Sequence, residues 1–192
     1  SLNNIIKNLF DIFLLLALGP ISLLLIFIIS IFVVLIDGRP LFYTQKRVGL
    51  NGKYFKIYKF RTMKQTGLKR SELESLNEKN KIVFKAKNDP RITKFGSFLR
   101  KSSLDELPQI INVLKNEMSF IGPRPPIIDE VKQYELKHLK RISVKPGITG
   151  LWQVTLRQDN NFDRWVEKDI EYIENWSLIL DIKILFKTLS EI

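Results

Sequence analysis

The sequence predicts a mainly α-helical protein with a small β component and a membrane-inserted helical segment at its start. Three observations favour this fold class. Residues 12–36 contain no charged side chain, several later stretches repeat apolar residues at helical spacing, and two strand-like stretches flank an Asn-Gly dipeptide. We expect a membrane segment over residues 1–37. A compact domain over residues 38–192 follows, with amphipathic helices that lie at the membrane interface.

The apolar segment is long enough to cross a bilayer. As a helix, residues 12–36 extend roughly 37 Å, against about 30 Å for a hydrocarbon core. Gly19-Pro20 lies in its middle, and proline kinks a helix because it removes a backbone hydrogen bond. A single spanning helix and a re-entrant hairpin, in which two helices on either side of this break enter and leave the same leaflet, are both open. Positive charge flanks both ends, at Lys7 and Arg39, so the positive-inside rule leaves both topologies open.

The other elements follow from local patterns. Residues 41–48 and 53–60 predict a β-hairpin around Asn51-Gly52. Helical spacing, caps and turn signals then predict, in order, a surface helix around residues 71–78 within a polar connector, and further helices over 93–100, 127–140, 161–173 and 176–192. Residues 151–155 predict a strand. Asp169 lies near an apolar stripe, so a buried partner of an arginine and a solvated acid are both open.

Composition limits the chemistry. The chain of 192 residues has no cysteine, one histidine and a formal charge of +11. Disulfides, cysteine-ligated zinc and histidine-based metal clusters or triads are therefore excluded. Carboxylates must hold any metal, which indicates magnesium. The basic excess indicates a polyanionic partner: nucleic acid, anionic lipid or a phosphorylated substrate.

One stretch, residues 102–109, combines two adjacent acids with a helix start. Ser103 and Glu106 have the spacing of a capping box, and apolar periodicity begins at Leu107. Asp105 and Glu106 then lie at a helix N-terminus, where the dipole favours anions. By itself this pattern favours a capped helix with two solvated acids.

The surrounding cations change that interpretation. Arg91 and Arg100 precede the acids, and Arg124 follows them between two prolines, which fix the backbone of a side chain suited to phosphate. Two acids surrounded by arginines indicate a metal and a phosphorylated substrate.

Together, these motifs resemble the bacterial sugar transferases, the monotopic phosphoglycosyl transferases. The resemblance covers nearly the whole chain, and it favours the re-entrant hairpin over the spanning helix. It rests on the apolar segment with its central proline and on five motifs in this order: KFRTM at 59–63, DPRIT at 89–93, SSLDELPQ at 102–109, GPRPP at 122–126 and KPGITGLWQV at 145–154.

The resemblance implies transfer of a sugar-1-phosphate from a UDP-sugar to undecaprenyl phosphate at the cytoplasmic face of the bacterial inner membrane, with release of UMP. Such a step starts capsule, exopolysaccharide, O-antigen or glycoprotein assembly. Asp105 corresponds to the nucleophile that takes up the phosphosugar, and Glu106 with Asp105 to the Mg²⁺ ligands. The expected phosphate contacts are Arg124 first, then Arg91, Arg100, Arg157, Lys59, Arg61 and Lys145.

The expected partners are the UDP-sugar, undecaprenyl phosphate and inner-membrane lipid, without nucleic acid; a homodimer is left open. Two positions depart from similar proteins: Gly19 precedes Pro20 where serine is common, and Leu156 precedes Arg157 where glycine is common. Two other function classes stay open: a metal-dependent phosphohydrolase, and a non-enzymatic membrane module that binds anionic lipid. Sensitivity to substitution of Asp105 distinguishes the module from an enzyme.

Overall fold

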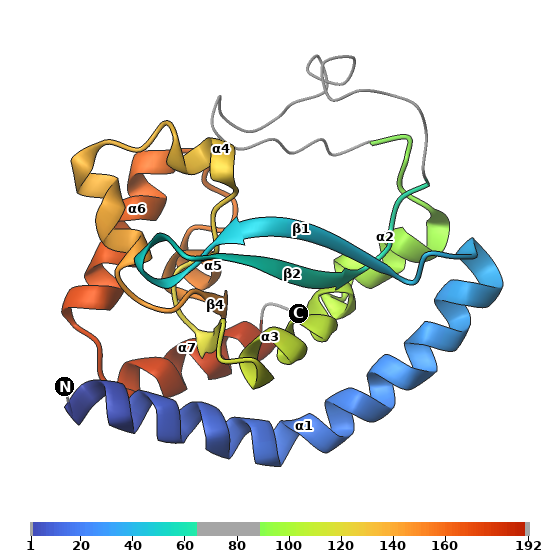
Figure 1. The fold of residues 1–192 in the computed structure, drawn as a ribbon, viewed down its shortest axis with the longest axis horizontal. Coiled ribbons are helices and arrows are strands. Elements are labelled where there is room, and N and C mark those ends of the chain that lie inside the picture. Colours follow the sequence, from blue (N-terminus) through green and yellow to red (C-terminus); the bar gives the residue numbers. More distant parts are fainter. Residues whose placement is uncertain (1, 65–88, 191–192) are drawn as a thin grey trace.

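The computed structural model describes residues 2–64 and 89–190. The predicted connector helix around residues 71–78 lies outside the described residues. Helices predominate and the strands form two small sheets, which confirms the predicted class (Figure 1). In chain order the elements are α1 (Leu2–Asp37), β1 (Phe42–Val48), η1 (Leu50–Gly52), β2 (Tyr54–Phe60), α2 (Lys94–Lys101), η3 (Leu104–Gln109), α3 (Ile110–Leu114), β3 (Ser119–Ile121), α4 (Ile128–Val131), η4 (Leu136–Ile142), β4 (Gly147–Thr149), α5 (Leu151–Thr155), α6 (Phe162–Glu174) and α7 (Leu178–Ser190).

Helix α1 is continuous through Pro20, so the expected break between two separate helices was wrong. Figure 1 shows it as one long helix that bends near its middle and passes α3 and α7 on its way to α2. Pro20 lies at this midpoint and explains the bend, because it cannot donate a hydrogen bond to the preceding turn. Most large apolar side chains of α1 are exposed.

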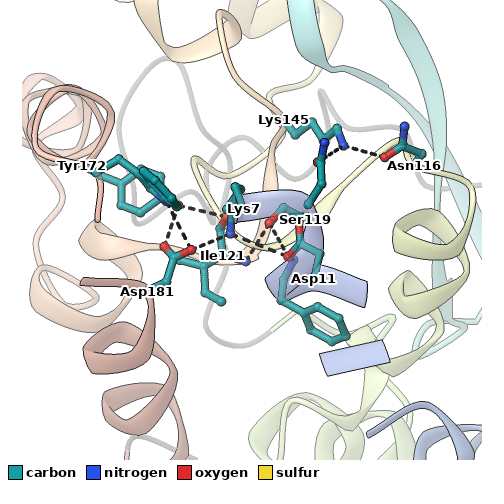
Figure 2. A network of polar contacts seen from close by, with 11 residues as sticks. Lys7, Asp11, Asn116, Ser119, Ile121, Lys145, Tyr172 and Asp181 are labelled. Atoms are coloured by element: carbon teal, nitrogen blue, oxygen red, sulfur yellow. Dashed lines mark hydrogen bonds and ion pairs between the residues drawn. The ribbon is translucent and has the colours of Figure 1, made fainter. Parts of the chain in front are cut away.

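Polar contacts fasten the first half of α1 to the rest of the protein (Figure 2). Lys7 donates to Asp181 at 2.7 Å, and Asp11 accepts from the Ser119 hydroxyl at 2.8 Å. Tyr172 donates to Asp181 at 2.8 Å. We name these five residues the anchor network. Its members come from α1, β3, α6 and α7, so it joins elements that are far apart in the sequence.

The other end of α1 is fastened as well. The Thr93 hydroxyl donates to the Asp37 carboxylate at 2.8 Å, and Arg61 donates to the backbone carbonyls of Asp37 and Gly38. Thr93 also accepts from the Gly96 backbone and so caps α2, the helix predicted over residues 93–100.

The predicted β-hairpin is confirmed. Strands β1 and β2 pair antiparallel, with Phe42 opposite Phe60 and Val48 opposite Tyr54. Asn51 and Gly52 take positive φ in the connection, at 52° and 78°. These are the residue types that turn a hairpin at least steric cost.

The strand predicted over residues 151–155 was wrong, because these residues form helix α5. The strand is instead β4, which pairs parallel with β3. Gly147 permits this pairing, since a Cβ there would lie 2.1 Å from the Gly122 backbone nitrogen. The run of apolar residues in α5 is too short for periodicity to separate helix from strand.

The helix predicted over residues 127–140 was also wrong. The structure has a single α-helical turn, α4, and then the separate 3₁₀ helix η4. The Glu135 side chain accepts from the His138 backbone, while the His138 ring accepts from the Glu135 backbone at 3.1 Å. This reciprocal cap starts a new helix at that point. His138, the one histidine of the chain, is buried in the fold.

Helix α6 begins after Asn161, whose side chain accepts from the Arg164 backbone, so the helix predicted over residues 161–173 is confirmed. Asp169 on this helix is buried and accepts from Arg141 at 2.8 Å. Of the two interpretations of Asp169, the structure has the buried arginine partner. Helix α7 follows where the last helix was expected, with Ile184 in the core and Phe186 exposed.

Candidate active site

A cavity of about 1080 Å³ opens among the hairpin, η3, α5 and the middle of α1. It brings together most of the site residues that the sequence analysis selected. The lining includes Lys59, Arg61, Arg91, Arg100, Asp105, Glu106, Arg124 and Arg157. Lys145 does not line the cavity, since it donates to Asn8 at 2.8 Å and also to Asn116.

The two adjacent acids, which we name the acid pair, lie in the first turn of η3. The predicted capping box was wrong: Ser103 has a left-handed conformation with φ of 55°, and its side chain caps nothing. Its backbone carbonyl instead accepts from the Glu106 backbone at 3.2 Å. Glu106 is therefore available for another partner, and it forms an ion pair with Lys59 of strand β2.

Asn112 holds the hairpin and the acid pair in register. Its side-chain nitrogen donates to the Lys56 carbonyl at 2.7 Å, and its side-chain oxygen accepts from the Tyr58 backbone at 3.2 Å. Because Asn112 is fully buried in α3, directly after η3, these bonds set Lys59 opposite Glu106.

The members of the acid pair differ in their proton affinity. Burial and the neighbouring Glu106 carboxylate raise the pKa of Asp105 to about 6, against the charges of Lys59 and Arg100. Burial acts on Glu106 too, but Lys59, Arg124 and Gln109 outweigh it and hold the pKa of Glu106 below its ordinary value. For Asp105, burial outweighs the nearby cations, although a pKa near 6 still leaves its carboxyl group mostly ionised at pH 7.

Arg124 projects from a turn that the hairpin holds in place. The Val48 backbone donates to the Pro126 carbonyl at 3.0 Å, and Arg47 donates to the Pro125 carbonyl at 3.0 Å. Within the described part of the chain, the Arg124 guanidinium has no hydrogen bond or ion pair. Its charge acts on Glu106 and on the cavity, as a phosphate-binding group requires.

Three of the other predicted cations already form hydrogen bonds or ion pairs within the protein. Arg91 forms an ion pair with Asp89 at 2.6 Å, and Arg100 donates to the Thr62 hydroxyl at 2.8 Å. Arg61 donates to the backbone carbonyls of Asp37 and Gly38 at the end of α1. All three still line the cavity, where they contribute positive charge around the acid pair.

Among the lining residues that sequence reasoning did not select are Arg47, Trp152 and Gln153. Arg47 is only 7% exposed, and burial together with the charge of Arg124 lowers the pKa of Arg47 to about 10. Alternation along β1 could not have indicated a buried side chain at Arg47, because the adjacent Val48 is buried as well. Trp152 and Gln153 were assigned to a strand, which hid their position on a helix beside the cavity.

The acid pair suits a divalent cation that the substrate helps to bind. No group of three or more acidic, histidine or cysteine side chains within residues 2–64 and 89–190 could enclose a metal. Magnesium sites commonly use one or two carboxylates and complete the coordination with substrate phosphates and water. Asp105 and Glu106 fit such a site, and the nearby Arg124 fits the phosphates.

Among the described helices, α1 is the one that is long and apolar enough to cross a membrane. Its middle reaches the cavity through Leu18 and Ser22. The cavity that holds the acid pair is therefore lined in part by this apolar helix.

The model of the family described as bacterial sugar transferase matches residues 2–192. The chain belongs to the bacterial sugar transferase family. This confirms the resemblance inferred from the motifs.

Several curated relatives are similar over most of this chain. The galactosyl transferase CpsE of Streptococcus agalactiae is 46% identical over 175 residues, which cover 88% of this chain and 39% of the relative. The exopolysaccharide production protein ExoY of Sinorhizobium fredii is 38% identical over 202 residues, 100% of this chain and 87% of the relative. The UDP-glucose:undecaprenyl-phosphate glucose-1-phosphate transferase of Escherichia coli is 42% identical over 169 residues, 83% of this chain and 34% of the relative.

The chain thus spans well under half of the CpsE and Escherichia coli sugar transferases and most of ExoY. The similarity places this chain with family members named for a lipid-linked sugar transfer and for exopolysaccharide production.

Proposed function

We propose that this protein transfers a sugar-1-phosphate from a UDP-sugar to undecaprenyl phosphate, releases UMP and so begins the assembly of a bacterial surface polysaccharide. The observation that carries the proposal is the acid pair in a cavity lined by Lys59, Arg100 and Arg124. The family and the names of its relatives support the two substrates. A protein face that binds anionic lipid would gain nothing from two acids at its centre, because they would repel the lipid headgroups.

In the first step, a carboxylate oxygen of Asp105 attacks the phosphorus that carries the sugar. An Asp105 O–P bond forms, the bridging P–O bond to the nucleotide breaks, and UMP leaves with the electron pair. A carboxylate that approaches a diphosphate meets like-charge repulsion, so the cations of the cavity must stabilise the transition state. Arg124 and Lys59 are placed to do so, and Glu106 positions Lys59.

In the second step, an oxygen of undecaprenyl phosphate attacks the same phosphorus. The bond to Asp105 breaks, the carboxylate is regenerated and the sugar remains on the lipid as a diphosphate. The lipid reaches Asp105 from the side of α1, whose Leu18 and Ser22 line the cavity. One cavity therefore serves a water-soluble donor and a lipid acceptor in turn.

Magnesium, held by Asp105 and Glu106 with the substrate phosphates, would neutralise phosphate charge in both steps. Excess chelator should abolish UMP release, and added magnesium should restore it. Full activity in chelator would refute the metal requirement.

We further propose that α1 enters and leaves the membrane on the cytoplasmic side. Lys7 and Asp11 near its start, and Asp37 at its end, all bond to the same folded domain. Ends fastened to one domain favour one side of the bilayer. The bend at Pro20 permits such a path without a break in the helix. Labelling of a cysteine at position 3 by a reagent confined to the periplasm would refute this topology.

A panel of UDP-sugars, assayed for UMP release by the protein in detergent with and without undecaprenyl phosphate, tests the activity. A phosphohydrolase would release phosphate without the lipid acceptor. A donor labelled in the phosphate next to the sugar tests the covalent step when no lipid is added. Label retained on denatured wild-type protein but not on Asp105→Asn supports two displacements, whereas UMP release only with lipid present supports direct transfer.

A further inference from the structure

Four buried side-chain atoms have no hydrogen-bond partner in the described part of the chain: Arg47 Nε, Trp152 Nε1, Gln153 Oε1 and Asp169 Oδ1. The first three belong to residues that line the large cavity. A buried polar atom without a partner costs free energy comparable with that of a lost hydrogen bond. Because the three side chains line one cavity, a ligand bound there can supply the missing partners.

A side cavity of about 20 Å³ brings two of these residues next to the chemistry. Arg47 and Gln153 line it together with Lys59, Glu106 and Arg124. These five residues also line the large cavity, so the small one is a recess beside the acid pair. Its volume admits one oxygen atom with its hydrogen rather than a whole phosphate group.

The three side chains are held in fixed orientations by their other contacts. The two terminal nitrogens of Arg47 donate to the Pro125 carbonyl at 3.0 Å and to the Gln45 side chain at 2.8 Å, so Nε is the donor without an acceptor. The amide nitrogen of Gln153 donates to the Ile148 carbonyl at 3.4 Å, so its Oε1 is the acceptor without a donor.

Trp152 is held by ring stacking. Its indole lies on that of Trp165, with 4.7 Å between the ring centroids and 19° between the planes. The stack fixes where the Trp152 N–H points and adds a flat apolar wall to the cavity.

The unpaired atoms distinguish between kinds of ligand. Arg47 Nε and Trp152 Nε1 donate hydrogen bonds, whereas Gln153 Oε1 accepts one. The oxygens of an ionised phosphate accept but do not donate, so they cannot satisfy Gln153. A hydroxyl both donates and accepts. A sugar also has a ring face of C–H groups that suits an aromatic wall.

We propose that Arg47, Trp152 and Gln153 bind the hydroxyls of the donor sugar and thereby determine which UDP-sugar the protein accepts. The inference rests on the proposed function, because that function puts the sugar one phosphate away from Asp105. The recess beside Glu106 lies at this position. A site built to hydrogen-bond a hydroxyl discriminates strongly against an analogue that lacks it, since its buried groups are then left unpaired.

The experiment compares kcat/KM for UMP release from the accepted UDP-sugar and from its monodeoxy analogues. In the wild type, loss of a recognised hydroxyl should lower kcat/KM about 10- to 100-fold. In Trp152→Phe, which keeps a ring on Trp165, or in Gln153→Met, the penalty for one analogue should fall to about threefold or less. The inhibition constant of UMP should stay within about twofold in both variants, because UMP carries no donor sugar.

Trp165→Phe is the matched control. It removes an indole N–H from the same ring stack, but that group already donates to the Asp159 carbonyl at 3.1 Å. Its penalties for the deoxy analogues should equal those of the wild type. Arg47→Lys, which keeps the charge but lacks Nε, should behave like Gln153→Met if the protein remains folded.

Unchanged deoxy penalties in Trp152→Phe and Gln153→Met would overturn the inference and leave water as the occupant of the recess. A UMP inhibition constant that rises as much as kcat/KM falls would overturn it in favour of a nucleotide contact. If the wild type releases UMP from no UDP-sugar, the proposed function fails instead. Saturation-transfer NMR with sugar 1-phosphates then decides: ring-proton signals that both variants abolish support the subsite, and their absence in the wild type refutes it.

Discussion

The anchor network and the acid pair are both clusters of buried or half-buried charge, but they differ in how completely the protein satisfies them. In the anchor network, Asp181 is fully buried and accepts from Lys7, Tyr172 and Trp176. In the cavity, Asp105 has a pKa raised to about 6 and Arg124 has no partner among the described residues.

The difference separates structure from function. A charge that has all its partners within the protein stabilises one arrangement of the chain, here the position of α1 against β3 and α7. A charge whose partners are missing costs stability, and it is retained where a ligand provides the missing contacts. The four predictions below test this distinction.

The largest effect is expected for Asp105→Asn. The amide fits the space of the carboxylate but cannot act as a nucleophile, so UMP release should fall by at least about four orders of magnitude. The unfolding midpoint should not fall, because burial already opposes the charge of Asp105. Steady-state assays and thermal unfolding in the same detergent measure the two quantities. A stable variant that keeps a tenth of the activity would exclude Asp105 as the nucleophile.

Asp181→Ala should mainly affect stability. It leaves Lys7, Tyr172 and Trp176 without their shared acceptor, and the loss of one partner from a buried ion pair costs about 3–5 kcal/mol of unfolding free energy. Denaturant unfolding in detergent checks this value, and faster proteolysis near the start of α1 should accompany it. Asp181→Asn keeps an acceptor oxygen and serves as the milder control. Wild-type stability with lost activity would place Asp181 with the site instead.

The raised pKa of Asp105 predicts an acidic limb in the pH dependence. The attacking form is the carboxylate, so turnover should be constant above about pH 7 and fall about tenfold per pH unit well below pH 6. Bound magnesium favours the carboxylate, so more magnesium should move the limb to lower pH. Rates from pH 4.5 to 8 at two magnesium concentrations test this. An acidic limb that lies at the same pH at both magnesium concentrations would argue against Asp105 as a magnesium ligand.

The smallest effect is expected for an exposed ion pair. Lys132 and Asp129 lie 3.0 Å apart with side chains 71% and 68% exposed, and water screens such pairs. Lys132→Met should change the unfolding free energy by no more than about 0.5 kcal/mol and leave UMP release unchanged. Denaturant unfolding beside Asp181→Ala gives a direct comparison. A loss of several kcal/mol would show that ion-pair burial does not explain the anchor network.

Much of the fold was predictable because its signals are local. The apolar run of α1, the Asn-Gly hairpin and the helix caps at Thr93 and Asn161 each depend on residues within a few positions. The candidate site was also predictable from the sequence, since the motifs selected Asp105, Glu106 and Arg124, and the structure brings all three to one cavity.

By itself, the sequence determined the helical class, the long apolar segment, the hairpin and the residue types needed for phosphate chemistry. Only the tertiary structure decided that residues 151–155 form a helix, because the pairing of β3 with β4 uses the preceding residues as the strand. It also decided that Asp11 and Asp181 hold α1, and that Arg47 and Gln153 share a recess. These contacts join residues that lie far apart along the chain, and no local periodicity, cap or turn signal depends on such distant partners.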